Sequence, residues 1–244
     1  METKPSTTTG ERFPQTLWSM VRHVQHGSEM VASEALNKLC RIYWHPIYGY
    51  IRNAAGRPEE AEDLTQGYFL HLLERDYINQ ASQDKGKFRA FLLADVKLFL
   101  SNERRSAKSE KRGGKVQIVP IQQDWAEERY GHEPVDNVTP DQLYDRHWAT
   151  TLLARVIELL RAEYERKGRL ELFEALKQFI SWNAGDEPYS VAAHKLGRDE
   201  NYVKQNVYRM RQSYRKLLEA EVAQTVTSPE EIEMEIRHLA ASLC

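Results

Sequence analysis

The sequence EPYSVAAHKLGRDENYVKQNVYRMRQSYRKLLEAEV, residues 187–222, predicts two helices that are joined by a short turn. The first helix is expected over Ser190–Leu196. Gly197 then accepts a positive φ at little cost, and Asp199 is a favourable N-cap for the second helix. That second helix carries one apolar stripe with spacings of four and three residues, formed by Val203, Val207, Met210, Tyr214 and Leu217.

The opposite face of the second helix is polar, and it suggests a nucleic-acid partner. Two helices joined by a tight glycine-containing turn are typical of helix-turn-helix proteins. Arginine pairs well with guanine edges and Asn or Gln with adenine, whereas lysines contact phosphates. The alternative is an αα-hairpin with an ordinary solvated face. The candidate DNA-binding residues are Arg198, Asn201, Tyr202, Lys204, Gln205, Tyr208, Arg209, Arg211, Gln212 and Arg215.

Charge is unevenly distributed along the 244 residues, although the net charge is only −2. Residues 97–115 and 195–216 each carry seven basic side chains against two acidic ones. Residues 121–145 and 219–235 are acidic instead. Two basic patches between acidic segments suggest a polyanion that is contacted at two places. The acidic segments are expected either to mask these patches in part or merely to keep the chain soluble.

Composition favours a soluble protein of the cytoplasm. Apolar residues make up 41% of the chain, enough for the cores of two small domains. The two cysteines, Cys40 and Cys244, show no pairing pattern or metal spacing. Residues 1–12 are polar and expected to be disordered, and no run is long enough for a membrane segment.

The N-terminal part predicts helices over 16–25, 28–55, 58–75 and 87–109. Pro46 is expected to break or kink the second of these, because proline lacks the N–H of a helix interior. Glu59, Glu60, Glu62 and Asp63 open the third helix and favour the positive end of its dipole. These carboxylates allow a metal-dependent nucleotide hydrolase as an alternative. However, no second ligand set and no phosphate-binding glycine loop accompanies them, so no metal, cofactor or catalytic residue is predicted.

The helix over 87–109 becomes basic towards its end. Phosphates and unstacked bases are the partners that such a basic and aromatic surface attracts. The alternative is a solvated helix end that complements the dipole. The candidate residues for this second contact are Phe99, Asn102, Arg104, Arg105, Lys108, Lys111 and Arg112.

The remaining chain predicts a linker over 113–140, helices over 141–166 and 170–182, and a last helix after Ser228. Ser228, Pro229 and Glu231 give that last helix a favourable start. Several stretches together resemble extracytoplasmic-function sigma factors of bacterial RNA polymerase. The stretches are EAEDLTQ (60–66), FLHLL (69–73), KFRAFL (87–92), the basic tract 104–115 and YVKQNVYRMR (202–211).

The resemblance covers about residues 30–112 and 145–225. It implies an all-α protein with a region-two-like domain (13–112), an acidic linker (113–140), a region-four-like helix-turn-helix domain (141–225) and a helical tail (226–244). It also implies a non-enzymatic subunit that binds core RNA polymerase and promoter DNA, with an inhibitory anti-sigma protein as a further partner. The helix from Lys87 would read and open the downstream element, and the helix-turn-helix would read the upstream one. The implied polymerase-binding residues are Asp63, Gln66, Phe69, Leu72 and Leu73.

The chain departs from the family at Leu98, where Asn is usual, and at Asn102, where Asp is usual. Asn201 and Tyr202 replace a pair of small residues, so the resemblance does not give the promoter sequence. A stand-alone helix-turn-helix regulator is the second hypothesis. It would explain residues 189–218 but not the other basic patch, and it would usually need a dimer.

Overall fold

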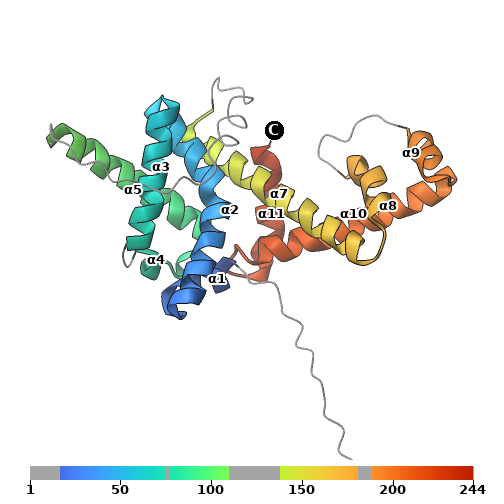
Figure 1. Ribbon diagram of the computed structural model, residues 1–244, viewed down its shortest axis with the longest axis horizontal. Helices are drawn as coiled ribbons and strands as arrows, with labels where there is room; N and C mark the ends of the chain where they lie inside the picture. Colours follow the sequence, from blue (N-terminus) through green and yellow to red (C-terminus); the bar gives the residue numbers. More distant parts are fainter. Residues whose placement is uncertain (1–16, 75–76, 110–137, 181–187, 244) are drawn as a thin grey trace, which may run out of the picture.

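The computed structural model describes residues 17–74, 77–109, 138–180 and 188–243 (Figure 1). These residues form α-helices, short 3-10 helices and the loops between them, which confirms the predicted all-α class for the described part. The expected leader 1–12 and almost all of the expected linker 113–140 lie outside the described residues.

The first hydrophobic cluster is assembled around one long central helix, α2 (Glu29–Ala55). α2 is buried without interruption from Tyr43 to Ile51. The helices of the N-terminal half that pack in this cluster are α1 (Leu17–His26), α3 (Pro58–Glu74), α4 (Tyr77–Gln80) and α5 (Phe88–Ser109). A 3-10 helix, η1 (Gln83–Lys85), precedes α5.

Pro46 was expected to break or kink the helix, and it does not break it, because α2 continues through Pro46. A proline in a helix interior removes one backbone hydrogen bond and costs about 3 kcal/mol. In the helical turns around Pro46, the side chains of Tyr43, Ile47 and Tyr48 are completely buried against other helices. Each such side chain contributes about 1.5–3 kcal/mol. Tertiary packing therefore outweighs the local cost.

Helix α7 (Pro140–Arg166) begins at a capping box, in which the Thr139 side chain accepts from the Gln142 N–H. Its N-terminal half packs against α2. The Trp148 ring stacks on Tyr43 with centroids 4.9 Å apart and an interplanar angle of 3°. At Gly49 the helices approach so closely that a Cβ atom would overlap the ring of His147. Only glycine leaves room for this contact.

The second hydrophobic cluster is formed by the C-terminal half of α7 with α8 (Leu170–Leu176), α9 (Tyr189–Leu196) and the N-terminal half of α10 (Glu200–Ala223). A 3-10 helix, η2 (Lys177–Phe179), follows α8 directly, where the sequence predicted a longer α-helix. The fully buried members of the second cluster include Leu160, Leu176 and Met210.

The chain then returns to the first cluster. After η3 (Pro229–Glu231), helix α11 (Ile232–Ser242) packs on α7 and α10, and Leu239 joins the first cluster with Val222 and Val226. Both α7 and α10 therefore contribute to both clusters. The described part of the molecule is elongated, with α5 at one end and α9 at the other (Figure 1).

Candidate nucleic-acid interface

The turn between α9 and α10 is built as the sequence predicts. Gly197 ends α9 with φ of 60° and ψ of 37°, in the left-handed region that glycine enters at little cost. The next N–H, of Arg198, donates to the Ala193 carbonyl at 3.0 Å. Asp199 caps α10, because its carboxylate accepts from the Tyr202 N–H at 2.7 Å. The turn thereby fixes the direction in which α10 leaves α9.

Helix α10 has one buried and one exposed side, as predicted. Val203, Val207 and Met210 are buried in the second cluster. Asn206 is also buried, and its amide donates to the Tyr202 carbonyl at 2.8 Å, so it belongs to the inner side. The exposed side carries the polar row Asn201, Lys204, Gln205, Tyr208, Arg209 and Gln212.

Two tyrosines distinguish this exposed side. Tyr208 has 65% of its surface exposed, an unusual position for a large aromatic side chain. Tyr202 is 37% exposed and lies under the guanidinium of Arg198, 5.4 Å from its ring centroid. This cation–π contact holds Arg198 at the start of α10.

Two of the candidate arginines are already bonded. Arg211 donates from Nε and Nη2 to the Phe179 carbonyl, at 3.2 and 3.0 Å, and so ties α10 to η2. Arg215 pairs with Glu219 at 2.8 Å and with Glu233 at 3.4 Å. The hydrogen bond to Glu219 and the two negative charges raise the pKa of Arg215. Arg211 is thus a structural residue, and Arg215 meets DNA only in competition with two carboxylates.

The second candidate set lies on α5. Asn102, Arg104 and Arg105 are exposed, and Arg104 donates to the Ala54 carbonyl at 3.3 Å. Phe99, in contrast, is 8% exposed and packs against Tyr68 and His71. The expected contact of Phe99 with unstacked bases would therefore require its ring to leave the core. The Lys108 side chain, Lys111 and Arg112 lie outside the described residues.

A hollow of about 540 Å³ adjoins this basic end of α5. Lys97 also lines this hollow, although the sequence did not suggest it as a binding residue. Helical spacing could have indicated Lys97, because it places this residue on one face with Ser101, Arg104 and Arg105. The hollow is lined by Tyr50, Ala54, Lys97, Leu100, Ser101, Arg104, Arg105 and Pro140.

Most residues of the expected polymerase-binding set are part of the core. Gln66, Phe69 and Leu72 are buried, and the Phe69 ring stacks on Trp44 with centroids 5.4 Å apart. Phe69 therefore presents little apolar surface to a partner in this conformation. Asp63 is exposed on the outer side of α3, and the Leu73 side chain lies outside the described residues.

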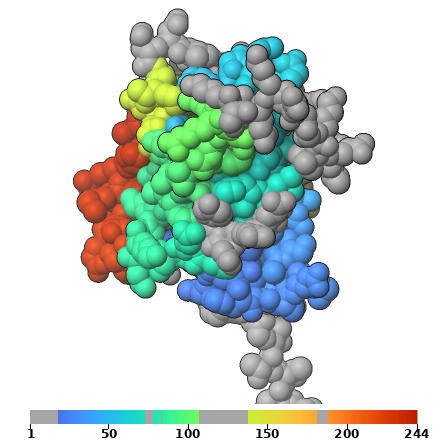
Figure 2. All heavy atoms as spheres, turned by 90° about the vertical axis from the view of Figure 1, so that its left-hand side faces the viewer, coloured from blue at the N-terminus to red at the C-terminus, as the bar shows by residue number. Residues whose placement is uncertain are grey.

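The two DNA-binding candidate sets occupy opposite ends of the molecule. The basic end of α5 projects at one end, and α9 with the start of α10 forms the other (Figure 1). Figure 2 looks onto the α5 end, where α5 (green) lies between α3 and the red surface of α11. One elongated polyanion could contact both ends.

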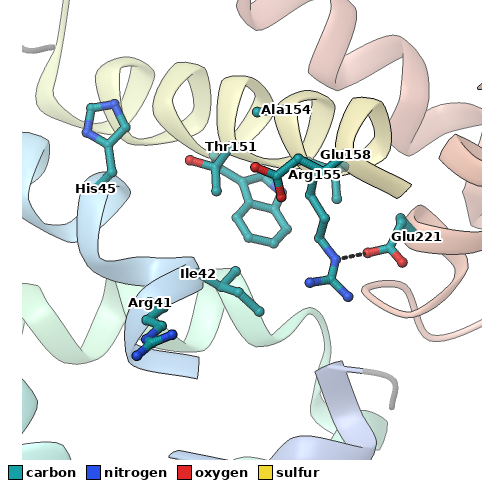
Figure 3. A pocket seen from close by; sticks show the side chains of 10 residues that line it. Arg41, Ile42, His45, Thr151, Ala154, Arg155, Glu158 and Glu221 are labelled. Atoms are coloured by element: carbon teal, nitrogen blue, oxygen red, sulfur yellow. Dashed lines mark hydrogen bonds and ion pairs between the residues drawn. The ribbon is translucent and has the colours of Figure 1, made fainter. Parts of the chain in front are cut away.

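A further cavity of about 230 Å³ lies between α2, α7 and α10 (Figure 3). Arg155 pairs there with Glu221 at 2.5 Å, and Arg41 and Glu158 also line the wall. Two positive and two negative side chains balance one another, so the cavity does not select for an anion. In the described part of the chain, no group of three or more His, Cys, Asp or Glu residues is arranged to hold a metal ion.

Comparisons with protein-family models, curated proteins and solved structures gave no match for this chain. None of the helices described here combines the length and apolar character needed to cross a membrane.

Proposed function

We propose that the protein is a sigma-type initiation factor, which binds core RNA polymerase and directs it to promoter DNA. The observation that carries the proposal is the exposed polar row of α10, held in a fixed direction by the Gly197 turn and the Asp199 cap. A basic surface on α5 at the opposite end of the same body supports contact with a second DNA segment.

The two ends are suited to different tasks. On α10, Gln205 and Arg209 have the donor and acceptor groups that read base edges in the major groove. Lys204 is suited to a phosphate, because its ion pair with Glu200 is long, at 3.7 Å. On α5, Arg104 and Arg105 beside the basic hollow are suited to a strand backbone. The α10 end would thus give sequence preference, and the α5 end would hold the DNA strand during opening.

Docking on polymerase cannot use Phe69 and Leu72 in this conformation, because both are buried. We assign docking instead to the outer side of α3, where Glu59, Glu60 and Asp63 are exposed. Such an acidic surface suits a basic partner surface, whose attraction accelerates encounter.

The test is co-purification with core RNA polymerase, followed by transcription from DNA selected by the resulting holoenzyme. Charge reversal at Glu60 and Asp63 is expected to abolish co-purification without changing the helical signal in circular dichroism. Glu171→Lys with Glu174→Lys, on exposed positions of α8, is the matched control. DNA binding without any polymerase binding by the unaltered protein would refute the proposal and favour a stand-alone regulator.

A further inference from the structure

One line of side chains along the exposed side of α10 carries no charge. This neutral line is formed by Asn201, Gln205, Tyr208 and Gln212, and all four are exposed. Their spacings of four, three and four residues place them on a single face of the helix. Within the described part of the chain, none of these side chains has a hydrogen-bond or ion-pair partner. Their polar and aromatic groups are therefore accessible to a ligand.

Positive charges flank the neutral line on both sides. Lys204 comes one position before Gln205, and Arg209 comes one position after Tyr208. Because successive residues lie about 100° apart around a helix, these two cations lie on opposite sides of the line. A neutral centre between two positive edges matches the major groove, in which the base edges lie between two rows of phosphates.

The acidic segment 219–235 leaves the start of the neutral line uncovered. The first turns of α10 lie with α9 at one end of the molecule (Figure 1). Among the described residues, this acidic segment meets the candidate DNA-binding side of α10 further along the helix, where Glu219 and Glu233 pair with Arg215. The expected masking of this basic patch by the segment is thus limited to Arg215 for the described residues.

The side chains along the neutral line fit A·T base pairs. An Asn or Gln amide pairs with N6 and N7 of adenine, and an apolar side chain contacts the C5 methyl group of thymine. One A·T pair presents both of these features in the major groove. Asn201 to Tyr208 span about 10 Å along the helix axis, which is about the rise of three base pairs. The two amides and the Tyr208 ring can therefore contact neighbouring pairs.

Tyr208 differs from the other exposed tyrosine of α10 in its surroundings. Tyr202 lies off the neutral line, and the guanidinium of Arg198 covers its ring at 5.4 Å. The Tyr208 side chain is 65% exposed and projects from the line itself, between the two basic edges. In the major groove this position directs the ring to the bases, whereas the basic edges meet the phosphates.

We propose that the Tyr208 ring reads the C5 methyl group of a thymine, beside an adenine that Gln205 reads. The DNA segment under the first turns of α10 accordingly contains A·T pairs. This inference rests on the proposed function, because it names the bases that α10 selects.

The test removes the methyl group and keeps the base pair. Duplex DNA is selected from a random pool through a tag on the full chain, with core RNA polymerase present. Each thymine of the selected DNA is then replaced in turn by deoxyuridine, which lacks the C5 methyl group. Dissociation constants are measured at one salt concentration for the unaltered protein, Tyr208→Ala, Tyr208→Phe and Lys204→Ala. The helical signal in circular dichroism is recorded for every variant.

The unaltered protein is expected to lose about fourfold in affinity at one thymine position, the usual effect of removing one apolar carbon group from a contact. Tyr208→Ala should bind thymine and uracil equally at that position, whereas Tyr208→Phe should keep the difference because the ring is retained. Lys204→Ala is the control for weaker binding as such: it should bind both DNAs less tightly and keep their ratio.

Equal binding of thymine and uracil at every position by the unaltered protein would overturn the proposal. A difference that survives Tyr208→Ala, or that disappears in Tyr208→Phe, would overturn it too. Failure of the full chain to select any DNA would overturn the proposed function as well. Selected DNA that is insensitive to uracil would overturn this inference alone and leave the proposed function standing.

Discussion

At the scale of single residues, burial separates side chains that the sequence places together. Phe69 and Phe99 lie in helices α3 and α5 beside polar candidate residues, yet both are core residues, 6% and 8% exposed. Their aromatic partners, Trp44 and Tyr68, come from other helices. Helical spacing alone does not show which face of a helix a neighbour will cover.

Phe99→Ala is therefore expected to destabilise the fold by about 3–5 kcal/mol, the usual cost of emptying a buried aromatic site. Urea unfolding measures this change in the free energy of unfolding. Tyr208→Ala on exposed α10 is the control and should change stability by less than about 0.5 kcal/mol while weakening DNA binding. Unaltered stability of Phe99→Ala would mean that this ring does not pack as described.

Glu235 gives the stability of the protein a defined pH dependence. Burial would raise the pKa of its carboxyl, but the charges of Arg89 and Lys87 and their hydrogen bonds outweigh this and lower the pKa below its ordinary value of 4.5. The other titratable groups beside these side chains are Asp145, which pairs with Arg89, and His238, which approaches Asp145 at 3.2 Å. The contribution of Glu235 is present above pH 4.5 and is lost as the pH falls through the lowered pKa.

The stability difference between the unaltered protein and Glu235→Gln should accordingly be large at pH 7 and shrink below pH 4.5. Urea unfolding at a series of pH values measures it, with Glu230→Gln, the same charge change on an exposed residue of η3, as the comparison. A difference that stays constant down to pH 3 would show that the carboxylate charge does not stabilise the folded state.

At the scale of helices, the region α9 to α10 was predictable because its determinants are local. Gly197, Asp199 and the apolar stripe from Val203 act within a few residues of chain. The burial of α11 was not predictable, because its sequence is typical of an acidic helix that faces solvent. Its buried carboxylate, Glu235, pairs with Arg89, which lies 146 residues away in sequence. The continuation of α2 through Pro46 was not predictable for the same reason, since partners from α3, α5 and α7 hold this helix.

Helix α10 divides its basic residues between binding and structure. Arg209→Ala is expected to cost roughly 1–3 kcal/mol in DNA binding and to relax preference at particular bases. Lys204→Ala should weaken all sequences about equally and lower the salt slope by about one. Arg211→Ala should instead lower the melting temperature, because it removes two hydrogen bonds to Phe179. Binding titrations at several salt concentrations, a DNA selection and thermal melting separate the three outcomes.

The contact of α2 with α7 depends on Gly49. Gly49→Ala is expected to push His147 out of its place and so weaken the joint between α2 and α7. Gly67→Ala in α3 makes the same change in backbone entropy at a site where the added Cβ would meet Phe99 Cζ at 3.5 Å, an ordinary contact. The melting temperature should fall for Gly49→Ala but not for Gly67→Ala, and equal melting temperatures would refute the close approach.

At the scale of the whole molecule, α7 and α10 pass through both hydrophobic clusters. Loss of either cluster leaves half of each long helix without its packing partners. We therefore expect one cooperative unfolding transition, with equal calorimetric and van't Hoff enthalpies, in place of two. Two separate transitions in scanning calorimetry would show that the clusters unfold independently.

The distance in sequence between α11 and α5 also has a consequence for biosynthesis. Lys87 leaves the ribosome 148 residues before its partner Glu235, which is about 7–30 s at ordinary translation rates. For most of that time the first cluster lacks Val222, Val226 and Leu239, and Arg89 lacks the Glu235 carboxylate. Until α11 is synthesised, the helices of the first cluster remain incomplete and accessible to chaperones, although α1 to α5 emerge well before it.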